Sequence, residues 1–443
     1  MRITVIGCGY LGAVHAASMS DLGHDVIGID VDEAKISMLA AGEAPFYEPG
    51  LPELLRSSLA SGRLHFSTDM SEAAGSRVHF VAVGTPQKTG ENAADLRHVD
   101  AAIDALVPWL APGDLVVGKS TVPVGTARRL AEKVADGSEA SLAWNPEFLR
   151  EGLAIEDTLR PDRLVYGLPD DSGEARELLD EVYAAALSAG TPLVATDYET
   201  AELVKVAANA FLATKISFIN AMAEVCEVVG ADVTQLADAI GHDARIGRRF
   251  LNAGLGFGGG CLPKDIRAFM ARAGELGADQ ALTFLREVDR INMRRRERAV
   301  DLAREMLGGS LLGSRIAVLG LAFKPDSDDV RDSPALSVSA QLSLQGAAVL
   351  CHDPKAIDNA RKRFPELSYT SSIEEAVTGA DAIMVLTEWD DYRELDPEWL
   401  ATKVARPIVI DGRNCLDAES WREAGWRYRA LGRPREARAM ALA

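Results

Sequence analysis

Short runs of apolar residues alternate with amphipathic stretches in the N-terminal part of the chain. The apolar runs predict β-strands at Ile3–Ile6, Val26–Asp30, Val78–Val83, Leu115–Lys119 and Leu142–Trp144. Apolar residues at helical spacing predict intervening helices over Gly12–Leu22, Glu33–Ala40 and Ala101–Leu110. This alternation is typical of βαβ units, in which helices cover a parallel sheet.

A long helical pattern follows, over Glu199–Gly230. This segment is rich in alanine and has no proline or glycine before its last residue. Its apolar positions nearly encircle the helix, so we expect it to be buried in a domain or subunit interface. Further helical patterns extend through Arg286–Met306, and the glycine-rich segment Gly254–Gly260 lies between the two.

A second βαβ pattern begins at Arg315. Strands are predicted at Arg315–Gly320, Ala348–Asp353, Ala382–Leu386 and Pro407–Asp411. The fold class is therefore α/β, with two Rossmann-like doubly wound lobes joined by a central helical domain. We place the three domains at residues 1–198, 199–300 and 301–443.

The composition fits a globular protein of several domains. Of its 443 residues, 47% are hydrophobic and 26% are charged, which is the balance of a folded chain. The formal net charge of −19 argues against nucleic acid or an anionic membrane as a general partner, because both would be repelled. An anionic substrate would need a local cluster of Lys, Arg and helix N-termini.

The five cysteines are widely spaced and form no CxxC or His-rich cluster. This pattern predicts neither a disulfide framework nor a metal site. The first residues already form a predicted strand, and no apolar run approaches membrane-spanning length. We therefore expect a cytoplasmic protein without a membrane segment, in which a reactive thiol stays reduced.

Gly7, Gly9 and Gly12 form a G-x-G-x-x-G motif directly after the first predicted strand. In a dinucleotide-binding turn, the first glycine permits the tight turn, the second admits the pyrophosphate and the third allows close helix packing. Asp30 ends the second strand, where a carboxylate can accept hydrogen bonds from a ribose and would repel a 2′-phosphate. The motif predicts NAD rather than NADP, with an ordinary turn as the alternative. Lys35 could add a contact to the adenosine end, although a solvated helix lysine is the simpler interpretation.

The segment Gly256–Asp265 combines four glycines with a cysteine, a lysine and an aspartate. The glycines bring backbone N–H groups close to a ligand, and Lys264 adds positive charge near Cys261. Oriented amides and nearby cations stabilise a thiolate, so Cys261 is a candidate nucleophile. A buried structural cysteine after a flexible loop fits the same segment.

Lys205 and Asn209 lie four residues apart in the long predicted helix, hence on one face, and Glu202 shares that face. A lysine and an amide on a mostly apolar helix need polar partners, because burial without them is costly. One such partner is an active-site oxyanion. An ion pair with Glu202 is the alternative, and the spacing alone favours it.

Polar loops follow three of the predicted strands, at Gly84–Pro86, Ser120–Pro123 and Asn145–Gly152. Open α/β sheets bind ligands at the carboxyl ends of their strands, so these loops are candidate binding segments. Each loop also has the composition of ordinary turns and helix caps.

These motifs, in this order, resemble those of the UDP-glucose/GDP-mannose dehydrogenase family, and the resemblance covers essentially the whole chain. Within the family, Pro161–Arg163 and Phe257–Asp265 are most similar to the UDP-glucose branch, and the GDP-mannose branch shares related motifs. The matching segments are Val5–Gly12, Ser120–Val124, Asn145–Gly152, Glu202–Asn209, Gly256–Asp265 and Phe323–Pro334.

The resemblance implies a four-electron, NAD-dependent oxidation of the primary alcohol of a nucleotide sugar to a carboxylate. UDP-glucose is the implied substrate and GDP-mannose the alternative. A non-catalytic NAD-binding protein is a further alternative, which the intact motifs argue against. A homodimer that shares the long helix is also implied.

Catalytic roles for individual residues follow from the same resemblance. Cys261 would be the nucleophile that forms a thioester. Lys205 and Asn209 would stabilise the developing oxyanion, and Asp265 would orient water for thioester hydrolysis.

The resemblance further implies that Thr121 and Glu147 hold a catalytic water or take part in acid–base work. The implied cofactor-binding residues are Gly7, Gly9, Tyr10, Leu11, Gly12, Asp30, Lys35, Thr85, Thr121, Glu151, Lys264 and Arg331. The implied substrate-binding residues are Glu147, Phe148, Leu149, Arg150, Glu151, Lys205, Asn209, Arg245, Phe250, Leu251, Asn252, Ala253, Gly254, Gly258 and Lys324.

One departure from the family pattern is Gly260, where serine commonly precedes the thiol. The change keeps the backbone donor, so we expect it to be tolerated. Asn414, directly after Arg413, is a second point of variation and leaves the role of Arg413 open.

Overall fold

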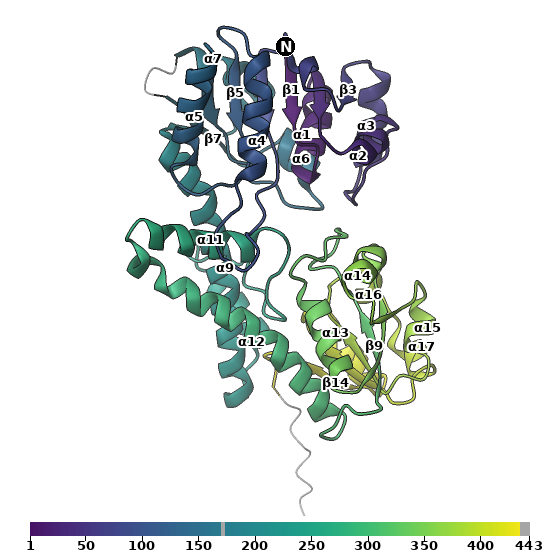
Figure 1. The fold of residues 1–443 in the computed structure, drawn as a ribbon. Coiled ribbons are helices and arrows are strands. Elements are labelled where there is room, and N and C mark those ends of the chain that lie inside the picture. The colour runs from purple at the N-terminus through teal and green to yellow at the C-terminus, as the bar shows by residue number, and fades with distance from the viewer. Residues whose placement is uncertain (170–172, 435–443) are drawn as a thin grey trace, which may run out of the picture. The chain divides into compact units, whose positions relative to one another are not determined.

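The computed structural model describes residues 1–169 and 173–434 (Figure 1). By internal contacts the chain forms two compact units. Unit 1 comprises Met1–Ala208 with Arg267–Asp279, and unit 2 comprises Asn209–Ile266 with Gln280–Ala443. The division into three domains made from the sequence stays a prediction, and each unit is described by itself.

Unit 1 is built on an eight-stranded sheet with the order β3-β2-β1-β4-β5-β6-β7-β8. Its strands are β1 (Arg2–Ile6), β2 (Asp25–Ile29), β3 (Leu64–Ser67), β4 (Val78–Val81), β5 (Leu115–Gly118), β6 (Ser141–Trp144), β7 (Leu164–Gly167) and β8 (Leu193–Thr196). The five strands predicted for this region are confirmed as β1, β2, β4, β5 and β6. The pairing is parallel except between β6 and β7, which pair antiparallel through Trp144 and Gly167.

Helices cover both faces of this sheet, as the doubly wound prediction requires. Successive side chains of β1 point to opposite faces of the sheet. Val5 packs into one core with α1, α3 and α6, whereas Ile6 packs into a separate core with α4 and α5. The α-helices that lie wholly within unit 1 are α1 (Tyr10–Asp21), α2 (Glu33–Ala40), α3 (Leu51–Ala60), α4 (Arg97–Leu106), α5 (Thr126–Gly137), α6 (Ala154–Leu159), α7 (Gly173–Val182) and α8 (Ala184–Ser188).

The long helix α9 (Tyr198–Val229) is continuous over 32 residues, as predicted. Within the single chain, burial covers one side of this helix, so its expected burial in a domain or subunit interface stays a prediction for the other side. Ala213 and Ile219 are fully buried, whereas Phe211, Phe218 and Val225 are 66%, 49% and 52% exposed in the single chain. By length and composition alone α9 is also able to cross a membrane, contrary to the expectation that no segment approaches that length. Long core helices pass the same test, and 44% of the relevant window is buried.

Unit 2 carries a six-stranded sheet, parallel throughout, with the order β11-β10-β9-β12-β13-β14. The strands are β9 (Arg315–Leu319), β10 (Ala348–His352), β11 (Ser368–Tyr369), β12 (Ala382–Val385), β13 (Ile408–Asp411) and β14 (Arg427–Ala430). The four strands predicted here are confirmed as β9, β10, β12 and β13. The short edge strands β11 and β14 were not predicted, and neither were β3, β7 and β8 in unit 1.

Helices surround this second sheet and link it to the middle of the chain. They are α10 (Val233–Gly241), α12 (Thr283–Met306), α13 (Pro334–Leu344), α14 (Ile357–Arg363), α15 (Ile373–Val377), α16 (Asp390–Arg393), α17 (Pro397–Ala401) and α18 (Ala418–Glu423). Ala299, Leu302 and Ala303 of α12 belong to the same core as the strands, so this helix is an integral part of unit 2. A further helix, α11 (Leu262–Glu275), follows the glycine-rich segment.

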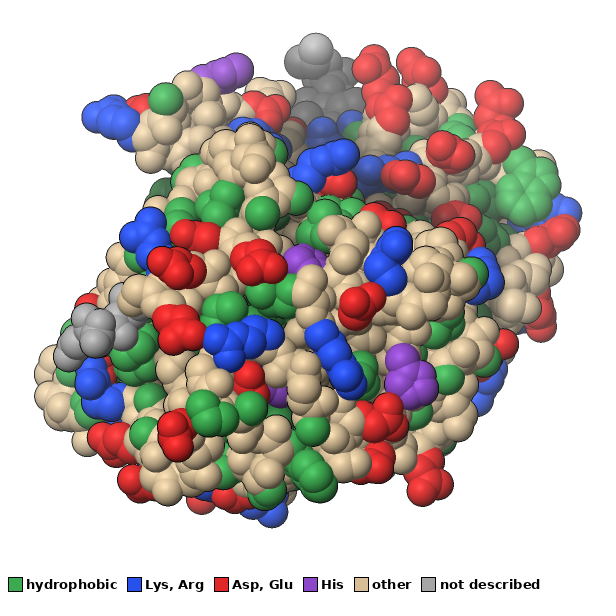
Figure 2. Space-filling view, turned by 90° about the horizontal axis from the view of Figure 1, so that it is seen from above, with side chains coloured by type: hydrophobic (Ala, Val, Ile, Leu, Met, Phe, Trp, Pro, Cys, Tyr) green, Lys and Arg blue, Asp and Glu red, His purple; other side chains and the backbone are tan. Residues whose placement is uncertain are grey.

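The topology positions the candidate loops. In unit 1 the strand order reverses between β1 and β4, and in such a sheet ligands bind beyond the carboxyl ends of the strands at that reversal. The loops after β1, β4, β5 and β6 all leave from this edge. Acidic and basic side chains are interspersed on the face shown in Figure 2, with hydrophobic side chains in small groups between them.

Candidate active site

The turn between β1 and α1 requires two of its three motif glycines on steric grounds. Gly7 has φ +89°, and a Cβ there would lie 2.6 Å from the Val83 side chain. A Cβ on Gly12 would lie 1.8 Å from the carbonyl oxygen of Gly7. A Cβ on Gly9 would meet no atom within 4 Å, so that position faces open space in front of the helix N-terminus. This is the geometry that a pyrophosphate needs.

Asp30 lies beside this turn, just beyond β2. Its carboxylate accepts hydrogen bonds from the backbone N–H groups of Cys8 at 2.8 Å and Asp32 at 3.0 Å. Lys35 is not merely a solvated lysine, because its Nζ lies 2.9 Å from Asp30 Oδ2. The pair presents one carboxylate and one ammonium where the adenosine ribose of a dinucleotide binds in this fold.

The loops that follow β4 and β5 are joined by hydrogen bonds. Thr85 Oγ1 donates to the carbonyl oxygen of Thr121 at 2.7 Å, and Ser120 Oγ donates to that of Val83 at 2.7 Å. Two of the three predicted polar loops therefore meet at one edge of the sheet, as expected.

The third loop, after β6, carries Glu147 to a buried lysine. Glu147 Oε1 lies 3.0 Å from Lys205 Nζ, and Glu147 Oε2 accepts a hydrogen bond from the Leu149 N–H at 2.8 Å. The Lys205 side chain is 6% exposed. The guanidinium of Arg163 stacks on the ring of Phe148, with 3.8 Å from its carbon to the ring centroid, and Lys205 Nζ lies 5.6 Å from the same centroid. Lys205 of α9 is thus held by the loop that the sequence analysis placed at the sheet edge.

Glu202, the alternative partner of Lys205, serves the start of α5. Its carboxylate accepts hydrogen bonds from the backbone N–H groups of Gly125 and Ala127, both at 2.7 Å. Burial raises the pKa of Glu202 to about 7, against the opposing effect of these N–H groups.

In unit 2, Cys261 lies directly before the first residue of α11. Its carbonyl oxygen accepts the first intrahelical hydrogen bond, from the Asp265 N–H at 2.9 Å. Free N–H groups at the start of a helix favour negative charge there. Of the five cysteines only Cys261 is exposed, so it does not fit the alternative of a buried structural cysteine.

A buried polar cluster lies one helical turn from Cys261. Asp265 is 2% exposed, and its Oδ2 accepts a hydrogen bond of 2.7 Å from Asn209 Nδ2. Lys264 Nζ lies 2.7 Å from the other carboxylate oxygen. Asn209, Lys264 and Asp265, all predicted site residues, are therefore brought together within unit 2.

The glycines before Cys261 pack against the loop that follows β9. A Cβ on Gly259 would lie 2.8 Å from the Phe323 ring, and the Gly259 N–H donates to the Arg331 carbonyl at 2.8 Å. A Cβ on Gly260 would lie 2.2 Å from Arg331 Cζ. The departure from serine at Gly260 thus leaves room for the guanidinium, which donates hydrogen bonds to both carboxylate oxygens of Asp329.

Two residues that sequence reasoning did not assign hold this glycine-rich loop. The amide of Asn292, buried in α12, accepts from the Phe257 N–H at 2.7 Å and donates to its carbonyl at 2.9 Å. Arg413 donates to the carbonyl oxygens of Gly256, Phe323 and Leu386. An uncharged amide in the middle of an amphipathic helix is the one sequence signal that could have pointed to Asn292.

Several predicted substrate residues are engaged with neighbours in their own unit. Arg150 is bonded to Asp157, and Arg245, whose side chain is 89% exposed, is bonded to Asp243. Phe250 has φ +65°. Leu251, Ala253, Gly254 and Gly258 are buried, Asn252 accepts a hydrogen bond from Arg248, and Lys324 lies against the Phe323 ring. Their contacts with a substrate stay a prediction.

The remaining predicted cofactor residues lie near the first turn of α1. The Tyr10 hydroxyl is bonded to Glu48, and the Gly152 N–H donates to that hydroxyl at 3.1 Å. Glu151 lies in the same loop as Gly152, and Leu11 lines a pocket described below. Among the described residues, no group of His, Cys, Asp and Glu could hold a metal ion.

Comparison with known proteins matches all three parts of the chain to one family. Residues 1–187 match the NAD binding domain of the UDP-glucose/GDP-mannose dehydrogenase family, residues 199–294 its central domain and residues 317–418 its UDP binding domain. The chain belongs to this family. Its cofactor is NAD, in agreement with the glycine turn and Asp30 described above.

Individual relatives of this dehydrogenase family match along the whole chain. A UDP-glucose 6-dehydrogenase of Rhizobium meliloti (strain 1021) is 44% identical over 98% of this chain and 100% of its own. The structure of a UDP-glucose dehydrogenase from the hyperthermophilic archaeon Pyrobaculum islandicum is 40% identical with a TM-score of 0.88, over 98% of each chain. A UDP-D-ManNAc dehydrogenase from Pyrococcus horikoshii is 28% identical with a TM-score of 0.85, over 98% of this chain and 99% of its own. The family and its two Rossmann-like lobes, expected from the sequence, are therefore confirmed.

Proposed function

We propose that this family member oxidises UDP-glucose to UDP-glucuronate through a covalent intermediate on Cys261. The full-length match to a UDP-glucose 6-dehydrogenase of Rhizobium meliloti at 44% identity is the main support. The exposed thiol before α11, one helical turn from the Asn209–Asp265 pair, supports the covalent route.

The first oxidation needs a group that accepts the alcohol proton. Glu147 and Thr121 lie in loops at the carboxyl edge of the unit 1 sheet and can hold a water that takes this proton. When bound, NAD supplies the hydride acceptor for both oxidations. The product of this step is an aldehyde at the sugar C6.

The second oxidation needs the thiol, because an aldehyde carries no alkoxide that can expel a hydride. The Cys261 thiolate adds to the aldehyde carbon, and the electron pair of the broken carbonyl π bond moves to oxygen. Lys205 and Asn209, one turn apart in α9, donate hydrogen bonds to this oxyanion. Loss of hydride re-forms the carbonyl and leaves a thioester on sulfur.

Hydrolysis returns the enzyme to its starting state. Asp265 orients a water and accepts its proton, hydroxide adds to the thioester carbon, and the C–S bond breaks with the thiolate as leaving group. One sugar therefore yields two NADH, one carboxylate and three protons, with one water consumed.

We also propose a cytoplasmic homodimer formed along α9. Phe211, Phe218 and Val225 repeat every seven residues and expose a row of apolar side chains along the helix in the single chain. A row with this period suits pairing with a second copy. Sedimentation of the wild type and of the Phe218→Asp variant tests this; a monomeric wild type contradicts it.

Counting NADH per sugar with UDP-glucose and with GDP-mannose tests the proposed activity. We expect two NADH per UDP-glucose and little turnover of GDP-mannose. One NADH per sugar would indicate a simple alcohol dehydrogenase, preference for GDP-mannose would assign the other branch of the family, and NAD binding without turnover would indicate a non-catalytic protein.

A further inference from the structure

A buried lysine lies directly after β5 and directly before the Ser120–Thr121 loop. Lys119 is 7% exposed. Its Nζ donates hydrogen bonds to Asn145 Oδ1 at 2.9 Å, to the Tyr183 hydroxyl oxygen at 3.2 Å and to the Asn145 carbonyl oxygen at 3.5 Å. No carboxylate in residues 1–169 and 173–434 lies within ion-pair distance of this nitrogen.

A charged ammonium group in this buried position destabilises the folded state. Burial lowers the pKa of Lys119 to about 8. The rings of Phe80 and Tyr183 lie 5.7 Å and 5.8 Å from Nζ and attract the cation in part. A methionine would fill the same space without the cost of removing a charge from water, so stability alone does not account for the lysine.

The lysine holds the first residue of the loop that carries Glu147. Asn145 donates from Nδ2 to the Val165 carbonyl at 2.9 Å and from its backbone N–H to the Gly118 carbonyl at 2.8 Å. The Tyr183 hydroxyl donates to Asn145 Oδ1 at 2.6 Å. These three residues, called here the Lys119 cluster (Lys119, Asn145 and Tyr183), fix the point where β6 ends and the loop begins.

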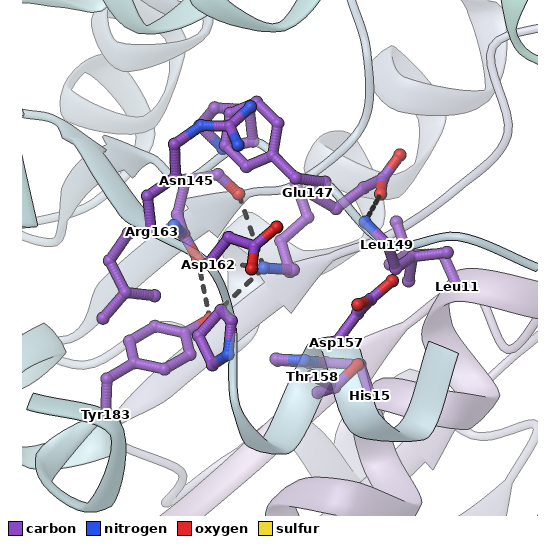
Figure 3. Close-up of a pocket in the computed structure, with 15 residues that line it drawn as sticks. Leu11, His15, Asn145, Glu147, Leu149, Asp157, Thr158, Asp162, Arg163 and Tyr183 are labelled. Carbon is purple, nitrogen blue, oxygen red and sulfur yellow. Dashed lines mark hydrogen bonds between the residues drawn. The ribbon is translucent and has the colours of Figure 1, made fainter. Parts of the chain in front are cut away.

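The loop then passes directly to the Glu147–Lys205 pair. Figure 3 shows Asn145 and Tyr183 together on one side of a pocket, with the Glu147 carboxylate pointing away from them toward the Leu149 backbone. Only Pro146 separates Asn145 from Glu147. The charge on Lys119 is also felt electrostatically by Glu147 and Lys205, which favour and oppose it respectively.

Other charged and titratable groups also face this pocket. Burial lowers the pKa of His15 well below its usual value, so His15 is neutral, and its Nε2 has no hydrogen-bond partner among the described residues. Asp157 is paired with Arg150, and Arg163 stacks on Phe148. The groups that face the pocket are His15 from α1, Lys119 directly after β5, Glu147 from the loop after β6, Asp157 from α6, Asp162 and Arg163 before β7, and Tyr183 after α7.

We propose that Lys119 is a positioning residue for the oxidation chemistry: its cluster holds the Asn145–Leu149 loop, and its positive charge biases the Glu147–Lys205 pair. This inference rests on the proposed function, because it assumes that Glu147 and Lys205 take part in turnover. Lys119 itself is not placed in contact with substrate or cofactor.

The test replaces the ammonium and keeps the apolar stem, with the Lys119→Met variant. Displacement of a reacting group by about 1 Å can cost on the order of 100-fold, so we expect kcat to fall about 10- to 100-fold. KM for NAD should stay within about twofold, since the glycine turn and Asp30 are untouched. The limbs of the kcat pH profile should move to higher pH, because loss of a neighbouring positive charge makes nearby groups hold their protons more tightly.

Two further variants separate charge from hydrogen bonding. Tyr183→Phe keeps the ammonium group of Lys119 and removes one of its hydrogen-bond partners. The limbs of its kcat pH profile should therefore match those of the wild type. Lys119→Gln keeps a donor for Asn145 without charge, so its pH limbs should move as in Lys119→Met while kcat falls less. Circular dichroism and Tm establish that each variant is folded. If Lys119→Met does not fold, Lys119→Gln carries the test by itself.

Hydrogen exchange of residues 145–149 adds a readout that needs no turnover. Faster exchange there in Lys119→Met, with unchanged exchange in β1, supports the positioning role even if the wild type fails to oxidise UDP-glucose. Unchanged exchange together with parental kcat and parental pH limbs in a folded Lys119 variant would overturn the inference.

Discussion

Asn209 Nδ2 lies 2.7 Å from Asp265 Oδ2, and both side chains are buried. The pair joins the helix that carries the predicted oxyanion donors to the helix that starts beside the thiol. Asp265 therefore presents an oriented carboxylate one helical turn from Cys261, where the last step of the proposed reaction needs a proton acceptor.

The Asp265→Asn variant should stall at the thioester. General-base catalysis contributes about 100- to 10,000-fold, so we expect kcat to fall by at least about 100-fold while UDP-glucose still binds. Intact-protein mass spectrometry after mixing with substrate and NAD should then show a covalent sugar adduct. Release of free acid at the parental rate would contradict this role for Asp265.

The Cys261→Ser variant should lose the second oxidation, because a hydroxyl is a far poorer nucleophile than a thiolate at neutral pH. We expect at most one NADH per sugar and aldehyde rather than acid as the product. The matched control is Cys415→Ser, which replaces a partly buried thiol in unit 2 and should keep the parental stoichiometry. Acid formed by Cys261→Ser at the parental rate would rule out the covalent route.

Asp30→Ala should weaken selection against NADP. Loss of the carboxylate removes the ribose acceptor and leaves Lys35 free to attract a 2′-phosphate. We expect KM for NAD to rise about 10-fold, in line with one lost charge-assisted hydrogen bond, and turnover with NADP to become measurable. Asp32→Ala, which removes only a cap at the start of α2, is the control for the cofactor ratio.

Two alanine variants of the glycine motif should fail in different ways. Gly12→Ala places a methyl group 1.8 Å from the Gly7 carbonyl oxygen, so it should reduce the free energy of unfolding by about 1–3 kcal/mol and weaken NAD binding as well. Gly9→Ala meets no protein atom within 4 Å, so it should weaken NAD binding with little change in Tm. Calorimetric titration of NAD and thermal melts of both variants distinguish these outcomes. Equal losses of Tm would mean that the second glycine is also structural.

The buried Glu202 should make stability fall as pH rises toward 7. A carboxyl group whose pKa is raised in the folded state binds its proton more tightly there than in the unfolded chain. Its stabilising contribution is complete below its ordinary pKa near 4.5 and is lost by about pH 7. In Glu202→Gln this fall should be absent, so urea unfolding at pH 5 and pH 7.5 should show a smaller difference than in the wild type. A difference equal to that of the wild type would show that Glu202 does not contribute to it.

Local sequence patterns were sufficient for the dinucleotide turn because its constraints are local. Gly7 has φ +89°, and a Cβ on Gly12 would meet the carbonyl oxygen of Gly7, so both requirements arise within the motif itself. The contact of Gly7 with Val83 comes from a distant segment, and the motif predicts glycine there without it. The edge strands escaped prediction because they are short and partly exposed: β11 has two residues, and Val194 in β8 is 47% exposed.

Side-chain partners depended on contacts between distant segments, which spacing does not encode. Glu202 and Lys205 share a helix face, yet Glu202 bonds to the start of α5 and Lys205 pairs with Glu147. From the sequence, Lys119 is only the last residue of a predicted strand. Nothing near it in the sequence indicates that Asn145 and Tyr183 accept hydrogen bonds from its ammonium group. Asn292 was missed for the same reason.

The distribution of the five thiols gives the unmodified protein a useful chemical handle. Cys8, Cys226 and Cys351 are buried, and burial raises the pKa of Cys415, leaving Cys261 as the accessible sulfhydryl. A maleimide fluorophore or an electrophilic fragment should therefore attach at one defined point without a cysteine-free background. Competition between such a reagent and nucleotide sugars would turn that single attachment into a direct assay of ligand occupancy, and a starting point for irreversible inhibitors.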